Sequence, residues 1–168
     1  MRADSRTVYC IDTSILIDLK RYPRDIFAVW ESFEDLIAKG LAIAPKQVRE
    51  ELRQWDDELY RWAVRHRKMF KPPTREQMKC VAEVLKGFPE LAHSERRVEA
   101  ADPFVIALAL AEKRESLFGE DYVVVTSEKP KPGRKNIPNA CDHLGLRCLT
   151  LFDFMRAEGW KFVRGRGK

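Results

Sequence analysis

Four short apolar segments have the length and composition of buried strands. The first of them is a run of bulky residues that lacks the strict alternation of apolar and polar positions that a half-exposed strand shows. These segments are residues 8–11, 41–44, 122–126 and 147–150. Strands that are apolar on both faces are typical of parallel sheets with helices on both sides.

The segments between these strands carry apolar residues at the three- and four-residue intervals of amphipathic helices. Helices are predicted over residues 15–19, 25–38, 45–52, 56–69, 74–86, 104–112, 140–144 and 151–158, with 87–99 as a loop containing some helix and 127–138 as a loop. The apolar face of the second helix is predicted to contain Ile26, Val29, Trp30, Phe33, Leu36 and Ile37. That of the helix over 56–69 is predicted to contain Leu59, Trp62, Ala63 and Phe70. Helices alternating with strands predict an α/β fold with a mainly parallel sheet.

The length of 168 residues and the apolar content of 45% fit one domain with a full core. No apolar run approaches the roughly 18–20 residues that span a bilayer, so no membrane partner is expected. The polar residues 1–6 lead straight into the first predicted strand. We therefore expect no signal peptide and a cytoplasmic location.

The four cysteines, Cys10, Cys80, Cys141 and Cys148, form no Cys-x-x-Cys pair, and no histidine stands at zinc-site spacing from them. They are therefore expected to be reduced thiols, mostly in the core, rather than ligands of a structural zinc ion.

The net charge of +5 suggests a polyanionic partner. Between residues 61 and 79 there are seven Lys or Arg residues and one acid. Arg61, Arg65 and Lys68 fall at positions i, i+4 and i+7, which places them on one stripe of the predicted helix. This stripe is either an ordinary solvated face or a ridge that contacts phosphates, with Arg134 and Lys135 of the later loop as a second contact. Trp62 and Phe70 are expected in the core rather than as platforms for stacked bases.

Acidic residues follow or flank the predicted strands. Asp12 directly follows the first strand, and Glu128 lies just past residues 122–126. Glu50 and Glu51 lie in the helix after the second strand, and Asp102 opens a helix that would pack on the sheet. In open parallel sheets ligands bind beyond the carboxyl ends of the strands, so four segments could bring carboxylates to one edge.

Carboxylates so placed repel one another and raise each other's pKa, and a divalent cation relieves the repulsion. Mg²⁺ suits such a site because it takes hard oxygen ligands and keeps several waters. The same arrangement supports phosphodiester hydrolysis, in which a metal lowers the pKa of a water and neutralises charge on the phosphate.

Each acid also has a structural explanation. Asp102 before Pro103 fits a helix N-cap followed by proline at N1, and Asp12 could cap the helix that follows it. At least one of Glu50 and Glu51 is expected on a solvated helix face, and Glu128 stands among lysines. The hypothesis of a site rests on the placement of all four together.

Other chemistries lack their motifs. The sequence contains neither the glycine-rich P-loop nor the dinucleotide-binding G-x-G-x-x-G. Thr13 and Ser14 have no evident histidine partner, so nucleophilic serine chemistry is not expected.

The ordered set of motifs resembles the PIN-domain superfamily over residues 7–155. The matching segments are residues 8–14, 48–52, 101–109 and 124–128. The resemblance implies a three-layer α/β/α sandwich around the sheet and Mg²⁺- or Mn²⁺-dependent ribonuclease activity.

The resemblance also implies roles for individual residues. It carries over Asp12, Glu51 and Asp102 as catalytic metal ligands. Glu51 is preferred to Glu50 because the family's glutamate usually precedes leucine, as Glu51 does here. The fourth acid would be Glu128, where the family usually has aspartate. Ser14 and Thr126 would match the small hydroxyl residues that support the cluster.

One nuclease domain over residues 1–160 is therefore expected, with a helical insertion at about 56–99 and a basic tail at 161–168. Many small PIN proteins are toxins of toxin–antitoxin pairs and are often dimers, which implies an RNA substrate, a small antitoxin protein and a homodimer. Two alternatives stay open: an RNA-binding module on the same fold without turnover, and a phospho-acceptor domain that uses Asp12.

Overall fold

The computed structural model describes residues 6–93 and 99–161, and its centre is a five-stranded sheet. All neighbouring strands in it are parallel, in the order β3-β2-β1-β4-β5. The strands are β1 (Thr7–Ile11), β2 (Ala42–Pro45), β3 (Phe70–Lys71), β4 (Asp121–Val125) and β5 (Arg147–Leu149). The prediction of an α/β fold with a parallel sheet is confirmed.

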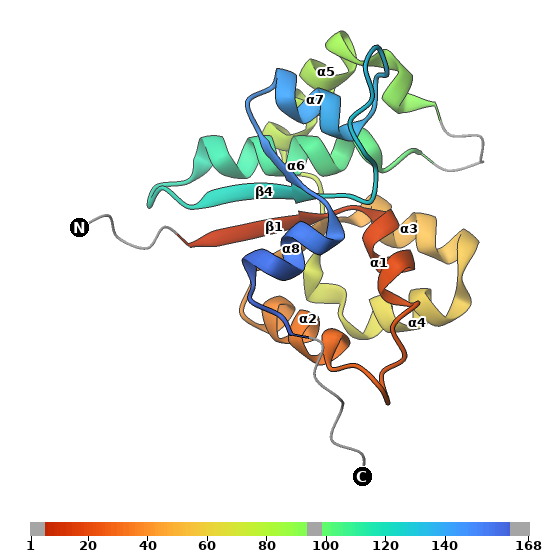
Figure 1. The fold of residues 1–168 in the computed structure, drawn as a ribbon. Helices are drawn as coiled ribbons and strands as arrows, with labels where there is room; N and C mark the ends of the chain where they lie inside the picture. The colour runs from red at the N-terminus through yellow and green to blue at the C-terminus, as the bar shows by residue number, and fades with distance from the viewer. Residues whose placement is uncertain (1–5, 94–98, 162–168) are drawn as a thin grey trace.

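Helices cover both faces of the sheet, which makes the fold a three-layer α/β/α sandwich (Figure 1). In the described residues the α-helices are α1 (Thr13–Leu19), α2 (Val29–Ala38), α3 (Lys46–Trp55), α4 (Asp57–Arg65), α5 (Arg75–Gly87), α6 (Asp102–Glu115), α7 (Ile137–His143) and α8 (Leu151–Ala157). Short 3-10 helices are η1 (Arg67–Met69) and η2 (Pro89–Ala92). Helices α5, α6 and α7 form one layer, and α1, α2, α4 and α8 form the other.

The two layers bury different kinds of side chain. Every residue from Pro103 to Ala111 in α6 is buried, because this helix packs on the sheet on one side and on α5 on the other. The opposite layer is built on aromatic side chains. The ring of Trp62 lies 5.2 Å from that of Trp30 and 6.1 Å from that of Phe33, measured between centroids. Trp62 and Phe70 are buried, which confirms their expected place in the core.

Two predicted helices begin or end at other residues. Helix α2 begins at Val29 rather than at residue 25, and Ile26, predicted on its apolar face, is 48% exposed. The backbone N–H groups of Ile26 and Phe27 both donate to the carbonyl of Pro23, which forms a turn instead. The helix predicted over 56–69 ends at Arg65 and continues as η1, so Lys68 does not extend an α-helical stripe.

Strand β3 has no counterpart in the predicted elements. It contains two residues, Phe70 and Lys71, which pair with Ala44 and Pro45 at the end of β2. A strand this short shows no periodicity in the sequence, which is why it was not predicted. The segment 56–99, predicted as a helical insertion, therefore also contributes an edge strand to the sheet. Residues 94–98 of that insertion, and nearly all of the predicted tail at 161–168, lie outside the described residues.

The four cysteines are free thiols, and all but Cys148 are buried, as predicted. In the described part of the chain, no helix is both long enough and apolar enough to cross a membrane.

The direction of chain progression changes between β1 and β4. From β1 the chain adds β2 and β3 on one side, and then crosses to β4 and β5 on the other. Such a reversal leaves a crevice at the carboxyl ends of the two central strands, which is where open α/β sheets bind ligands. The residues that follow β1 and β4 are Asp12 and Thr126.

Candidate metal centre

Asp12 lies at this reversal point and is held there by two hydroxyl groups. Ser14 Oγ donates to Asp12 Oδ2 at 2.5 Å, and Thr126 Oγ1 donates to the same oxygen at 2.9 Å. Thr126 reaches it because Ile11 and Val125 are paired in register, so that the two strands end side by side. Asp12 occupies the N-cap position of α1 without making a side-chain capping bond. Its carboxylate is oriented by the two hydroxyls, and the backbone N–H groups of Thr13 and Ser14 at the start of α1 also favour its charged form.

Burial of this carboxylate has an electrostatic cost. Asp12 is 4% exposed, and burial raises its pKa above the ordinary value. The hydrogen bonds from Ser14 and Thr126 oppose that shift because they favour the charged form. Asp12 is thus a buried acid whose negative charge is only partly compensated by protein groups.

Glu51, one turn into α3, joins three elements near Asp12. Thr13 Oγ1 of α1 donates to Glu51 Oε2 at 2.5 Å, and the backbone N–H of Ala101 donates to Oε1 at 2.9 Å. The neighbouring Glu50 instead has a 40% exposed side chain, whose carboxylate lies 3.5 Å from the guanidinium of Arg49. The structure therefore places Glu51 toward the other acids and Glu50 on the surface.

Asp102 is the first residue of α6 and lies one position after the N-cap residue, Ala101. Its pKa rises to about 8, first because the carboxyl is buried and then because of the charges of Asp12, Glu128 and Glu51. Such charge effects act at short range. Asp102 therefore lies where the other three acids converge, and helix capping does not explain it.

Glu128 is half-buried and has a second role in the fold. Its carboxylate accepts a hydrogen bond of 2.9 Å from the backbone N–H of Ile137, the first residue of α7. Burial raises the pKa of Glu128, the bond from Ile137 lowers it, and the charge of Asp12 raises it further. Glu128 thus belongs to the acidic cluster and also anchors the loop that follows it.

The cluster offers oxygen ligands and excess negative charge, which suits a hard divalent cation. In residues 6–93 and 99–161, however, no three Asp, Glu, His or Cys side chains lie close enough to hold an ion between them. Hydrogen bonds to backbone N–H groups hold both glutamates, Glu51 and Glu128. Of the four acids, Asp12 and Asp102 are therefore the ones that would hold such a cation.

The sequence of this chain matches a family described as "Domain of unknown function (DUF4411)" over residues 9–162. The chain belongs to the DUF4411 family. All four acids of the cluster lie within the matched range. No curated protein matches the chain in sequence.

Buried polar side chains mark the same edge of this DUF4411 domain. Five of them are buried in the described residues, and four, Asp12, Thr13, Gln47 and Thr126, follow β1, β2 or β4. Sequence reasoning missed Thr13 as a partner of Glu51, and it missed Gln47. The Asp-Thr-Ser motif could have indicated Thr13, because a helix that starts there turns its side chain away from that of Asp12.

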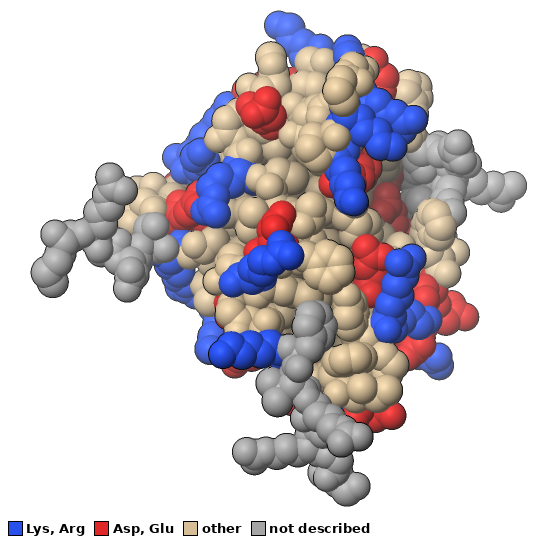
Figure 2. Space-filling model, viewed as in Figure 1, with Lys and Arg blue, Asp and Glu red and all other residues tan. Residues whose placement is uncertain are grey.

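The two predicted basic contacts of the DUF4411 chain lie in different layers. Arg134 and Lys135 are exposed in the loop that begins after Glu128 and rises beside α5 and α7 (Figure 1). In Figure 2, blue Lys and Arg side chains gather over this loop. Arg61 and Arg65 are exposed on α4, in the opposite layer, and Lys68 is exposed in η1. Only the loop continues directly from a residue of the acidic cluster.

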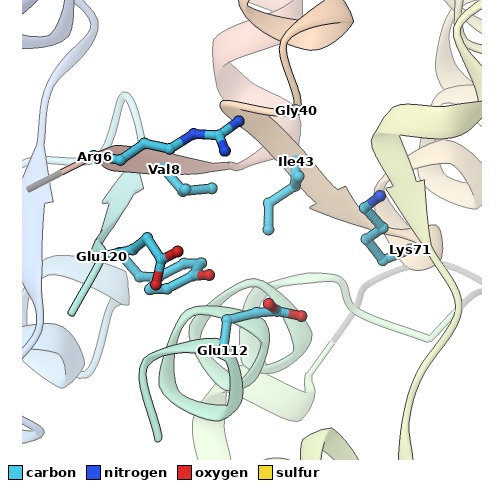
Figure 3. Close-up of a pocket in the computed structure, with 8 residues that line it drawn as sticks. Arg6, Val8, Gly40, Ile43, Lys71, Glu112 and Glu120 are labelled. Carbon is cyan, nitrogen blue, oxygen red and sulfur yellow. The ribbon is translucent and has the colours of Figure 1, made fainter. Parts of the chain in front are cut away.

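A hollow of about 190 Å³ lies between the sheet and the end of α6 (Figure 3). Its lining comprises Arg6, Val8, Gly40, Ile43, Lys71, Glu112, Glu120 and Tyr122. Arg6 and Glu120 directly precede β1 and β4, so this hollow is at the sheet edge opposite the acidic cluster. Its two acids are balanced by two cations, and it therefore lacks the excess negative charge that favours a divalent cation at the carboxyl edge.

Proposed function

We propose that this chain is a divalent-metal-dependent ribonuclease that hydrolyses RNA phosphodiester bonds. The observation that carries the proposal is the convergence of Asp12, Glu51, Asp102 and Glu128, from four separate segments, at the carboxyl edge of a parallel sheet. Buried acids this close to one another destabilise a fold unless a cation or a proton neutralises them.

Two further arguments support the proposal. The motifs around the four acids resemble those of PIN-domain nucleases, and the α/β/α sandwich is the fold which that resemblance implies. The chain also carries an exposed basic loop, residues 129–135, directly after Glu128. Cationic side chains beside an acidic metal centre can bind the phosphates that flank the bond to be cleaved.

In the proposed mechanism the residues of the chain would hold a divalent cation and orient its ligands. Asp12 and Asp102 would hold Mg²⁺ or Mn²⁺, and Ser14 and Thr126 keep the carboxylate of Asp12 in one orientation. Asp102 would hold the cation in its charged form, because the positive charge would replace the proton as the neutralising partner. A divalent cation held there would lower the pKa of a water and neutralise charge on the phosphate. Glu51 and Glu128 accept hydrogen bonds from waters at the site.

The test is cleavage of a single-stranded RNA by the purified full chain with Mg²⁺ or Mn²⁺. Asp12→Asn should reduce the rate by at least about 100-fold, because it removes a ligand charge while preserving shape. Asp25→Asn is the matched control, since Asp25 is exposed in a turn before α2. Cleavage that survives Asp12→Asn, or that persists in a chelator, contradicts the proposal.

A second candidate function is RNA binding without turnover. It is favoured by the backbone hydrogen bonds that already engage the carboxylates of Glu51 and Glu128, and by glutamate at position 128. This candidate predicts RNA binding that weakens with salt and no cleavage with any divalent cation.

The toxin role belongs to the same proposal and rests on the PIN resemblance alone. It requires RNA in the cytoplasm as the substrate, a small antitoxin protein as the partner and, in the simplest form, a homodimer. Expression of the chain should then stop growth of a host cell, and Asp12→Asn should abolish that effect.

A further inference from the structure

Gln47 is a buried polar residue at the carboxyl end of β2 that none of the roles above uses. It is 4% exposed and lies in the first turn of α3. Its amide nitrogen Nε2 donates to Glu99 Oε2 at 3.3 Å. Its amide oxygen Oε1 is buried and accepts no hydrogen bond.

A buried carbonyl oxygen without a donor costs free energy, and such groups are rare in folded proteins. The orientation of this amide follows from its neighbour. Turning the amide over would bring Oε1 against the carboxylate of Glu99, where two acceptors repel. The amide nitrogen therefore faces Glu99, and the amide oxygen must point away from that carboxylate.

Helix spacing and one hydrogen bond place this amide near Glu51 of the acidic cluster. Gln47 precedes Glu51 by four residues, so the two side chains lie on the same face of α3. Its partner Glu99 stands three residues before Asp102, and the intervening Ala101 donates its N–H to Glu51. The amide thus lies between α3 and the segment that leads into α6, as Glu51 does.

We infer that Gln47 is a positioning residue of the metal centre, whose Oε1 accepts a hydrogen bond from the hydration shell of the divalent cation. The inference rests on the proposed function, since it requires that a cation binds. Mg²⁺ retains several waters in protein sites, and these waters need acceptors. A neutral amide oxygen provides one without adding a fifth charge to a cluster of four acids. Residues in this position orient the ligands and raise metal affinity.

The test measures Mn²⁺ binding to the full chain by titration calorimetry, with Gln47→Met as the variant, because methionine keeps the length of the side chain and removes the acceptor. We expect Mn²⁺ affinity to fall by about 10-fold or more. Gln77→Met is the matched control. Gln77 is 1% exposed and also has an unpartnered Oε1, but it lies on α5 and donates to the carbonyl of Phe104.

Equal Mn²⁺ affinity in Gln47→Met and the unsubstituted chain overturns the inference and leaves the proposed function standing. An equal loss in Gln77→Met also overturns it, because the effect is then one of packing. If the unsubstituted chain binds no Mn²⁺, the inference and the proposed function fail together. Should Gln47→Met not fold, Gln47→Leu replaces it in the titration. Leucine also lacks an acceptor, so that variant should show the same loss of Mn²⁺ affinity, and unchanged affinity contradicts the inference.

Discussion

At the scale of single residues, the buried acids at the carboxyl edge of the sheet lower the stability of the metal-free protein. Asp12 and Asp102 stand where the core would otherwise favour apolar side chains, and burial raises the pKa of both carboxyls. Ser14, Thr126 and Thr13 supply hydrogen bonds that fix the acids without neutralising them. The edge is therefore expected to be the least stable part of the metal-free protein and to be stabilised by a cation.

Asp102→Asn should stabilise the metal-free protein in a way that depends on pH. The folded pKa of Asp102 is about 8 against an ordinary 3.8, so between these values unfolding releases a proton. The original protein therefore loses stability as pH rises from about 4 to about 8, and the asparagine variant does not share that loss. At pH 8 in chelator the variant should be more stable by about 1 kcal/mol or more, and at pH 4 the difference should vanish.

Thermal unfolding across this pH range measures the effect, with roughly 2–4 °C expected per kcal/mol for a chain of this size. Asp25→Asn serves again as the exposed control and should leave the pH profile unchanged. Adding Mn²⁺ should reverse the ranking, because a bound cation stabilises only the chain that retains the ligand. A variant that is less stable than the original protein at pH 8 would show that Asp102 is a structural cap after all.

At the scale of elements, the sequence is most informative where a pattern is long. Segments 8–11 and 122–126 are continuous apolar runs, and both are central strands within a residue of the predicted bounds. Strand β3 has two residues and no pattern of its own, and its position depends on pairing with Ala44, a contact between distant segments. The start of α2 was missed because Pro23 accepts from Ile26 and Phe27 in a turn that competes with the helix.

The candidate site divides in the same way. Asp12 and Glu128 follow strands, and the rule for carboxyl ends locates them from sequence alone. Other contacts around the cluster can be seen only in the folded chain. Thr13 bonds to Glu51 and Gln47 bonds to Glu99, and each pair is dozens of residues apart in the sequence. Ser14 and Thr126, which bond to Asp12, were expected from the resemblance, whereas the contacts of Thr13 and Gln47 leave no spacing in the sequence and were beyond prediction.

The basic loop after Glu128 is held by side chains at the start of α7, and Asn139 makes two of these bonds. Asn139 Nδ2 donates to the carbonyl of Lys131 at 2.7 Å and also to that of Arg134. Helix α7 has its own N-cap, Asn136, whose side chain accepts from Asn139 N. Asn139→Ala should therefore release the loop while leaving the helix capped.

Limited trypsin digestion measures this release, because Arg134 and Lys135 are the loop positions not followed by proline. Cleavage after these two residues should become several-fold faster in Asn139→Ala, with a change in global stability of about 1 kcal/mol or less. Asp142→Ala, an exposed site on the same helix, is the control. Unchanged cleavage would mean that other contacts hold the loop.

At the scale of the whole molecule, the reversal of strand order brings two halves of the chain together at the candidate centre. The chain from β1 to β3 supplies Asp12 and Glu51, and the chain from α6 onward supplies Asp102 and Glu128. The basic residues also fall into two groups, with Arg61 and Arg65 in the layer of α2 and the basic loop in the layer of α5. If the proposed function holds, an RNA strand at the acids would contact the loop, since the loop adjoins Glu128.

The salt dependence of RNA binding distinguishes the two basic surfaces. Each phosphate contact to single-stranded RNA contributes about 0.7 to the slope of log K against log salt. In an Asp12→Asn background, which keeps the RNA intact, replacing Arg134 and Lys135 together with serine should make that slope shallower by about 1.4. The matched double substitution of Arg61 and Arg65 removes the same charge from α4 and should change the slope by less than half as much. Long-range attraction by net charge alone predicts equal changes, and a larger change from the α4 pair would place the RNA across the opposite layer.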